Sequence, residues 1–350
     1  MGVLLGVVAM KIEEALEVCQ NIWSSQRNAI KLEIVRQDFE KMVILEEVGQ
    51  SHFGGLPDVP EGFEWPSYDY VEKRYLPFGK VEDGETKLCH LHFIAQFNLE
   101  QISLLDKDNL LPKKGLLLFF YDCYNQCWGY DPNEKGSWRG LYFEDITALK
   151  RARVPEGVDP DFIFPKLAIK AHARPNLIDF EDYYDRFGAI DAYDFAKARY
   201  MCLKHLDCNL EQLKEEEPQE YEDFVAQLSA LLSQDGCSDE IRYGDGADDY
   251  HQLLGYPTII QNSMTIDCEL LRQGFNVGRG WSDLPMEVRQ EAQHNGPKNW
   301  LLLFELDGVT DEQSDFELMF GDCGMIYFYI RKDELESGNF DGVWLRLQCY

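Results

Sequence analysis

The stretch SHFGGLPDVPEGFEWP, residues 51–66, decides how the first half of the chain enters its core. Gly54 and Gly55 can adopt backbone conformations that other residues avoid, and the prolines of the stretch stiffen its path. We interpret it as a rigid loop that leads into the core and is anchored at its end by Trp65. The functional alternative is that this loop lines a ligand cleft.

Apolar runs on either side of a short turn predict two strands after this loop. Residues 90–97 (HLHFIAQF) are typical of a half-buried strand, and Asn98 can cap a helix that follows. Residues 116–121 (LLLFFY) are apolar on both faces, which indicates a central strand covered on both sides. Gln96 is a polar amide in its apolar strand. We expect it to bond a partner inside the fold or in a ligand, because an unsatisfied buried amide costs on the order of a few kcal/mol.

Elements of the first half recur in the same order near the C-terminus. Gly255 and Pro257 of LLGYPTI stand as Gly55 and Pro57 do, and an apolar strand NWLLLFELD follows. The segment GDCGMIYFYIRKD then repeats a glycine followed by an aromatic and aliphatic strand. Three elements in one order predict an internal duplication. We therefore expect an α+β fold with an internally duplicated, pseudo-symmetric core of mostly antiparallel strands and flanking helices.

The chain divides on this basis into an N-terminal helix, residues 1–27, and one folded unit, residues 28–350. Within the unit we assign residues 28–179 to the first half and residues 250–350 to the second. Residues 180–249 form an acidic helical insertion. Its helical stripe consists of Tyr221, Phe224, Val225, Leu228, Leu231 and Leu232.

Charge restricts the classes of partner. The 350 residues include 33 Lys and Arg against 63 Asp and Glu, a formal net charge of −30. Such a surface repels phosphate backbones and anionic membranes, so neither nucleic acid nor a membrane is an expected partner. A basic protein is compatible with it. The ten cysteines are scattered and the apolar start is too short to span a bilayer, which favours a cytoplasmic protein with reduced thiols.

Familiar catalytic motifs are missing from the sequence. It contains no nucleophile elbow, no phosphate-binding loop ending in Lys-Ser or Lys-Thr, and no His-Glu-x-x-His. His90 and His92 have the spacing of a ligand pair on a strand, but no further ligands accompany them. We therefore predict no metal and no cofactor, and the sequence leaves open whether any reaction is catalysed.

Five stretches together resemble the YwqG-like family, a group of mainly bacterial proteins of unknown function. They are SHFGGLPDVPEGFEWP, FIAQFNL, LPKKGLLLFF, GDCGMIYFYIRKDEL and FDGVWLRLQCY, and they span roughly residues 28–350. The resemblance implies a soluble α+β protein with a duplicated core, and it supplies no catalytic residues. The acidic helical region and the apolar start look like departures from the shorter family pattern.

Two hypotheses about function follow. The first is a non-enzymatic binding protein whose acidic surface engages a basic protein, with toxin neutralisation as one setting. The second is an enzyme or a binder of a small molecule, with its site in a cleft between the duplicated halves. The candidate residues for that cleft are His52, Gly54, Gly55, Trp65, Gln96, Asp322 and Gln348.

Overall fold

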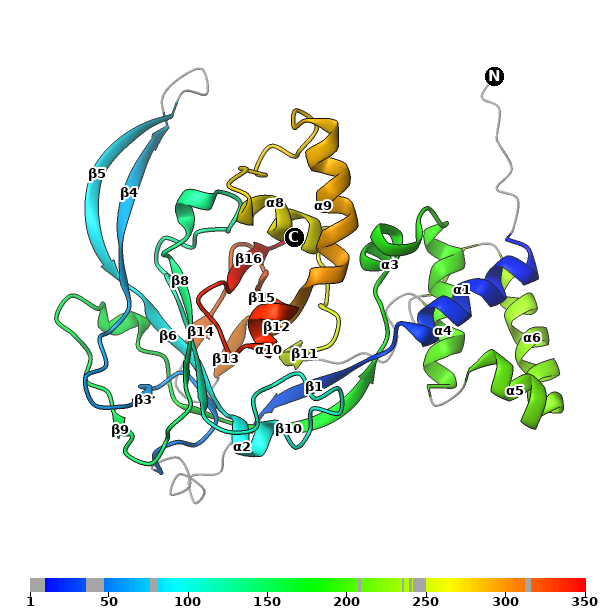
Figure 1. Cartoon of the computed structure of the whole chain (residues 1–350), viewed down its shortest axis with the longest axis horizontal. Helices are drawn as coiled ribbons and strands as arrows, with labels where there is room; N and C mark the ends of the chain where they lie inside the picture. The colour runs from blue at the N-terminus through cyan, green and yellow to red at the C-terminus, as the bar shows by residue number, and fades with distance from the viewer. Residues whose placement is uncertain are drawn as a thin grey trace. The chain divides into compact units, whose positions relative to one another are not determined.

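The computed structural model describes residues 10–35, 47–75, 81–206, 209–234, 236–238, 241, 250–311 and 316–350. By contacts the chain forms two compact units, one of Met1–Asn28 with Pro175–Asp248 and one of Ala29–Arg174 with Asp249–Tyr350. The first unit is helical and the second contains most of the strands (Figure 1). The α+β class predicted from the sequence is confirmed. Among the described residues, no helix is both long and apolar enough to cross a membrane.

The described residues of the first unit form five named helices. They are α1 (Ile12–Ser24), α3 (Phe180–Phe187), α4 (Ala192–Lys204), α5 (Leu210–Glu216) and α6 (Pro218–Leu232). Aromatic side chains connect them: the rings of Trp23 and Phe224 lie 5.4 Å apart, and those of Tyr183 and Phe195 lie 5.0 Å apart. The stripe predicted on α6 points inward through Phe224, Leu228 and Leu232. Packing of this amphipathic face holds these short helices together.

A ten-stranded sheet dominates the second unit. In spatial order its strands are β16 (Trp344–Gln348), β15 (Met325–Arg331), β12 (Trp300–Leu306), β11 (Gln252–Leu254), β1 (Arg27–Ile34), β10 (Leu167–Asn176), β2 (His52–Phe53), β6 (His92–Asn98), β7 (Leu116–Tyr121) and β8 (Trp138–Phe143). Every pairing with a described register is antiparallel. All six residues of β7 are buried, as its continuous apolar sequence predicts.

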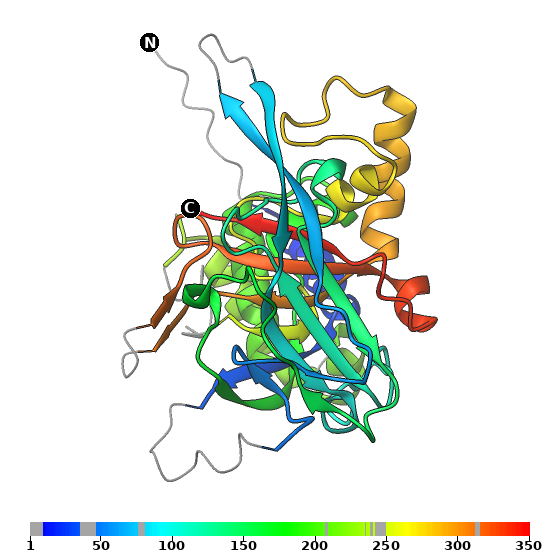
Figure 2. The ribbon, with the colours of Figure 1, turned by 90° about the vertical axis from the view of Figure 1, so that its left-hand side faces the viewer.

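Smaller elements surround the sheet. Three two-stranded ribbons pair β4 (Ser67–Tyr75) with β5 (Val81–His90), β3 (Asp58–Val59) with β9 (Lys150–Arg151), and β13 (Val309–Asp311) with β14 (Phe316–Leu318). The β4–β5 ribbon extends well beyond the sheet (Figure 2). The helices of this unit are α2 (Leu99–Ile102), α8 (Thr265–Arg272), α9 (Met286–Asn299) and α10 (Lys332–Glu336), with single turns η3 (Pro132–Glu134) and η4 (Pro160–Phe162). The predicted Asn98 cap is confirmed, since its side chain accepts a hydrogen bond from the Glu100 amide.

Helix α9 runs further than its sequence suggests. The Asn-Gly-Pro sequence predicts an end near His294, but the helix continues to Asn299 with Pro297 inside it. Proline there lacks the N–H that would bond the carbonyl of residue 293, so the helix loses one backbone hydrogen bond. Gly296 meets α8 so closely that a Cβ would lie 2.8 Å from the Cα of Ile266. Packing against α8 therefore outweighs the local stop signal.

Hydrogen bonds join the end strand β16 to residues 128–130 and hold it near the other end strand, β8. The Gly129 carbonyl accepts hydrogen bonds from Trp344 Nε1 at 3.0 Å and from Arg346 Nη1 at 3.1 Å. The Leu347 amide donates to the Trp128 carbonyl at 3.1 Å. From β8 itself, Trp138 Nε1 donates to the Val343 carbonyl at 2.9 Å. These bonds hold the segment after β7 against β16, so residues far apart in the strand order become neighbours.

The sheet has two arms, one of β2, β6, β7 and β8 and the other of β11, β12, β15 and β16, and the two arms share local irregularities. Gly54 and Gly55 follow β2 with positive φ, and Leu254 and Gly255 do the same at β11. The pairing of β6 with β7 shifts register after Phe93, and the pairing of β12 with β15 shifts after Leu302. A duplicated core would produce such correspondences. The duplication itself stays a prediction.

Replacing Gly129 by alanine should loosen the contact between the end strands. Gly129 has φ of +74°, and an added Cβ would overlap the Leu345 carbonyl. Gly62 has φ of +80° with nothing within 4 Å, so Gly62→Ala isolates the backbone cost, roughly 1 kcal/mol. We expect Gly129→Ala to lower the free energy of unfolding by about 2 kcal/mol more than this control, measured by urea unfolding. Equal losses in the two variants would show that the close approach is not needed.

Candidate functional site

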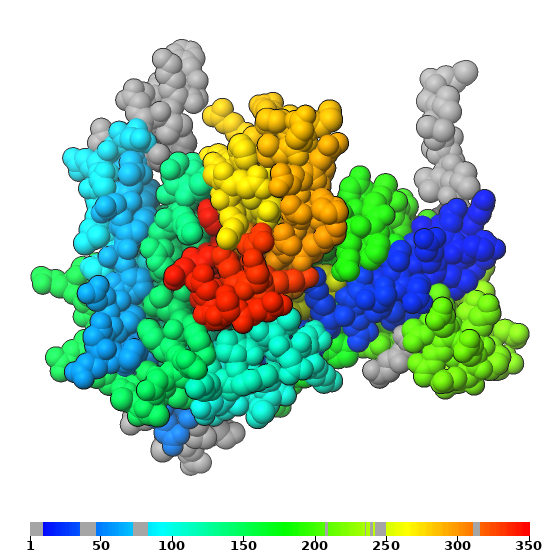
Figure 3. All heavy atoms as spheres, in the orientation of Figure 1, coloured from blue at the N-terminus to red at the C-terminus, as the bar shows by residue number. Residues whose placement is uncertain are grey.

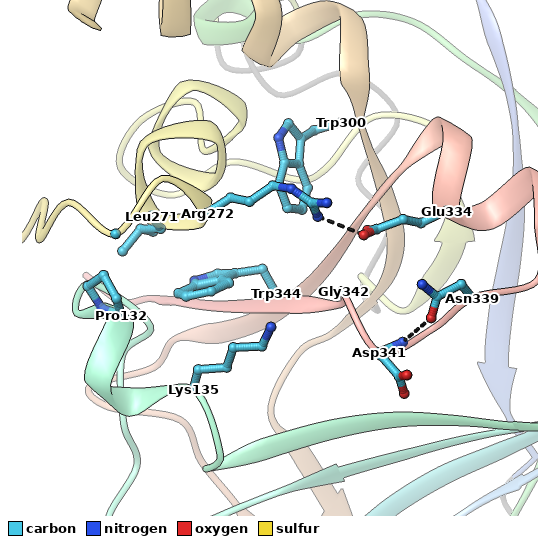
Figure 4. A pocket seen from close by; sticks show the side chains of 11 residues that line it. Pro132, Lys135, Leu271, Arg272, Trp300, Glu334, Asn339, Asp341, Gly342 and Trp344 are labelled. Atoms are coloured by element: carbon cyan, nitrogen blue, oxygen red, sulfur yellow. Dashed lines mark hydrogen bonds and ion pairs between the residues drawn. The ribbon is translucent and has the colours of Figure 1, made fainter.

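A cavity of about 460 Å³ is lined by residues from distant parts of the chain. Pro132 and Lys135 come from the η3 turn, and the other lining residues come from α8 and the residues just after it, β12, α10, and β16 with the segment that leads into it (Figure 4). In Figure 3 the red C-terminal segment lies at the surface beside the yellow and orange segments that include α8 and α9. The turn that carries Lys135 is fixed locally, because the Asp131 side chain caps η3 and Pro132 is its first residue.

Two tryptophans and a leucine form the apolar part of the cavity. Trp300 and Trp344 are 1% and 3% exposed, and Leu271 lies beside them at the end of α8. Each indole N–H is already satisfied: Trp300 Nε1 donates to Glu269 Oε2 at 2.8 Å, and Trp344 Nε1 donates to the Gly129 carbonyl. The rings therefore present only carbon atoms to the cavity, which suits an apolar part of a ligand.

Charged side chains surround this apolar floor. Arg272 Nη1 donates to Glu334 Oε1 at 2.7 Å across the opening (Figure 4). The Lys135 side chain is exposed and reaches toward the segment of Gly342 and Asp341. Within the described part of the chain its amine makes no hydrogen bond or ion pair, and neither does the Asp341 carboxylate. An ammonium group without a partner at the cavity is the clearest electrostatic feature of this site.

The carboxylate of Glu334 is held very close to the backbone. A Cβ at Gly342 would overlap both of its oxygens, so only glycine allows this approach. Glu334 Oε2 is buried and has no hydrogen-bond partner in the described structure. Glu334 therefore orients the Arg272 guanidinium through this ion pair, while the remaining N–H groups of Arg272 stay available to a ligand.

None of the predicted site residues lines this cavity. His52, Gly54, Gly55 and Gln96 come together, because His52 lies opposite Gln96 in the β2–β6 pairing and its Nδ1 donates to the Gly54 carbonyl at 2.9 Å. His52 and Gln96 are both fully buried. Burial lowers the pKa of His52 to about 3, so its imidazole is neutral.

Gln96 finds its partners inside the fold. Its Oε1 accepts from the Asp58 amide at 2.8 Å, and its Nε2 donates to the Gln50 carbonyl and to Asp58 Oδ2, both at 2.7 Å. Asp58 also accepts from Arg151 Nε at 2.6 Å. Burial would raise the pKa of Asp58, but these bonds hold it below its usual range. The network fastens the loop of residues 47–60 to β6.

The other three predicted residues are also bonded internally. Trp65 Nε1 donates to the Leu91 carbonyl at 2.7 Å, and its ring packs edge-on against Phe120. Gln348 Oε1 accepts from the amides of residues 260 and 261, both at 3.1 Å, on the opposite arm of the sheet. The carbonyl of Asp322 accepts from the Tyr350 amide. A role in ligand binding for the seven residues stays a prediction.

The histidine pair named in the sequence does not converge on further ligands. His92 Nδ1 accepts a hydrogen bond from the Cys123 amide at 3.0 Å. Across the described residues, no three His, Cys, Asp or Glu side chains are grouped so that they could hold a metal ion. His92 is thus used for structure, as an acceptor for the chain leaving β7.

Sequence reasoning missed the charged residues of the cavity. Lys135 sits in the turn after η3, Arg272 ends α8, and Glu334 lies on α10. The sequence around Asp131 and Pro132 predicts a capped turn but gives no reason to select Lys135. Among the cavity residues, only Trp300 stands out in the sequence, because Trp281 and Trp300 flank the helix expected before the last strands.

Glu305 occupies the place in the second arm that Gln96 holds in the first. It lies opposite Tyr327 in β15, and its carboxylate accepts from the Thr258 amide at 2.9 Å and from Thr258 Oγ1 at 3.2 Å. Its side chain is fully buried. Burial raises the pKa of Glu305 to about 8, only partly offset by these bonds and by Lys31. The folded protein therefore keeps a proton on Glu305 at neutral pH.

Glu305→Gln should change the pH dependence of stability. The folded-state pKa is raised from 4.5 to about 8, so the wild-type free energy of unfolding loses this contribution as the pH rises from 4.5 to 8. The loss is at most roughly 5 kcal/mol. Glutamine cannot ionise, so the variant should equal the wild type near pH 5 and exceed it by several kcal/mol at pH 8. Urea unfolding at several pH values tests this, with the exposed Glu287→Gln as control; parallel curves for all three proteins would contradict it.

Most of the chain matches a known protein family. Residues 51–349 match the model of a family described as Domain of unknown function (DUF1963). A search of curated proteins found no match. The matched region begins at the loop before β2 and includes both arms of the sheet and every residue that lines the cavity.

Proposed function

Because the chain belongs to the family described as Domain of unknown function (DUF1963), we propose a function from the site alone: binding of a small organic anion in the cavity between the two halves. This develops the second hypothesis drawn from the sequence with a different set of residues. We also propose that the chain belongs to the narrower YwqG-like group. The observation that carries it is the Lys135 ammonium, which reaches toward the cavity without a partner in the described chain.

Charge and shape both support an anionic ligand. On a chain of net charge −30, Lys135 and the partly exposed Arg272 place two cations at one opening. They attract an anion locally where the rest of the protein repels it. The Trp344 and Leu271 side chains offer carbon surface for the body of the ligand. A volume of about 460 Å³ is in the range of small-molecule sites.

The lining favours binding over nucleophilic catalysis. Among the described residues that line the cavity there is no serine, cysteine or histidine. Of the two carboxylates, Glu334 is engaged with Arg272 and its other oxygen is buried. Retention of an anion by fixed cations needs none of these groups.

Binding of simple carboxylates tests this function. Benzoate, titrated into the full chain, should quench tryptophan fluorescence and raise the melting temperature. Lys135→Met should weaken binding by about 10-fold or more, since it removes the unpaired cation. Lys113→Met is the matched control, because Lys113 bonds only to Asn109 on the surface.

The same titration can reject the proposal. Lys135→Met removes an exposed amine without a partner, so its melting temperature without ligand should equal that of the wild type. Affinity that is unchanged in this folded variant, or absence of binding by the wild-type protein at millimolar concentration, would contradict anion binding at the cavity.

A second candidate function is binding of a basic protein by the helical unit. Around the junction of α5 and α6, the exposed side chains of Glu215, Glu216, Glu217 and Glu220 are consecutive or nearly so. Glu220 raises the pKa of Glu217, through a hydrogen bond and charge repulsion. Crowded like charges are relieved when a cationic surface binds. Toxin neutralisation is one setting for such a partner.

A charge-neutralised variant separates this candidate from non-specific attraction. The tagged chain is used to capture partners from its source lysate near physiological salt, and the four glutamates are changed to glutamine. A stoichiometric basic protein that is lost from this variant and at high salt would support the candidate. Glu13, Glu14 and Glu17 on α1, changed to glutamine, form the control. A partner retained by the fourfold variant would contradict the assignment to α5 and α6.

A further inference from the structure

A second cavity of about 320 Å³ adjoins the first. Lys135 and Asp341 belong to the lining of both cavities, so they form a common wall. On the far side, the second cavity is lined by Arg139 of β8, with Phe340 and Val343 supplying apolar surface. Arg272 lines the first cavity, Arg139 lines the second, and Lys135 lines both.

Arg139 is a cation without an ion-pair partner. Its Nη1 donates to the Trp138 carbonyl at 2.8 Å, and no carboxylate of the described chain lies within ion-pair distance. The side chain is half-buried. Burial lowers the pKa of Arg139, which Asp341 offsets only in part. A partly desolvated guanidinium of this kind gains more from an added anion than an exposed one does.

Asp341 decides how the charges of a ligand must be arranged. Its carboxylate stands in the common wall, next to Lys135, and has no hydrogen bond in the described structure. A compact polyanion at this point would meet a like charge at short range. A ligand whose two acidic groups are separated by an uncharged middle would avoid it.

We propose that the ligand is an elongated dianion that spans both cavities, with one acidic group at Arg272 and Lys135 and the other at Arg139. This deepens, and rests on, the proposed binding of a small organic anion. The uncharged middle passes Asp341, where a hydroxyl or amide donor would be favoured. The site is thereby specific for dicarboxylates or similarly separated anions.

Calorimetric titration with a length series tests the proposal. The probes are the α,ω-dicarboxylates from succinate to azelate and the monocarboxylates of equal chain length, added to the full chain. We expect one chain length to bind best, about 10-fold or more tighter than its monocarboxylate. Arg139→Gln should abolish this preference and leave the affinity for monocarboxylates unchanged. The exposed Arg153→Gln serves as the matched control.

A second variant keeps the test decisive if Arg139→Gln folds poorly. Asp341→Asn removes the like charge from the common wall, so a compact anion such as citrate should bind at least about 10-fold tighter to it than to the wild type. The elongated dianion should gain less than citrate. An equal gain for both probes would overturn the role given to Asp341.

The outcomes separate the two proposals. Monocarboxylate binding that depends on Lys135, without any preference for dicarboxylates, would overturn the dianion inference and leave anion binding intact. A dicarboxylate preference that survives in folded Arg139→Gln would also overturn it. Absence of binding by every carboxylate would remove both proposals.

Discussion

The carbonyl oxygen of Gly129 accepts two hydrogen bonds from β16, and the candidate site depends on this contact. It brings the segment after β7 against the last strand of the sheet. Lys135, which follows within the same turn region, then lines one cavity with Arg272 and Glu334. The close approach is allowed because residue 129 has no side chain, and it is secured by donors that cannot reach water. Arg346 is fully buried and also bonds Asp267 at 3.0 Å, so its other donors reinforce the same junction.

Buried polar side chains of the sheet hold the neighbouring loops in position. Gln96 and Glu305 sit at matching places in the two arms, and each accepts a hydrogen bond from the amide of the loop that follows the neighbouring strand. A buried acceptor left without a donor is costly, so each side chain fixes its loop in one position. The Gln96 amide can also donate: it bonds Asp58, which in turn accepts a hydrogen bond from Arg151. The acid instead takes up a proton, which makes the second arm sensitive to pH.

The electrostatics of the protein differ between the surface as a whole and the cavities. A net charge of −30 excludes most anions from the surface. Lys135, Arg139 and Arg272 gather around one short segment, and only Arg272 is paired with a carboxylate. The lining of the two cavities carries these three cations and two carboxylates, Glu334 and Asp341, so its local balance is positive whereas that of the whole chain is negative. This is why overall charge indicates a basic partner while the cavity indicates an acidic ligand.

The sequence by itself determined the buried strand β7, the helix cap at Asn98 and the antiparallel α+β class, because these follow from local patterns of apolar residues and backbone preference. The half-buried strand predicted over residues 90–97 is instead β6, which begins at His92 and is buried throughout. The sequence also identified the loop of residues 51–66, where Gly54 and Gly55 have positive φ as expected. Tertiary structure alone decided that α9 passes through Pro297 and that Gln96 bonds within the fold. It also decided that Lys135 and Arg272 line the same cavity. Such contacts join residues distant in the chain, and no local preference encodes which distant strand a loop will meet. The cavity and its lining charges form only because the end strands of the sheet, β8 and β16, lie together.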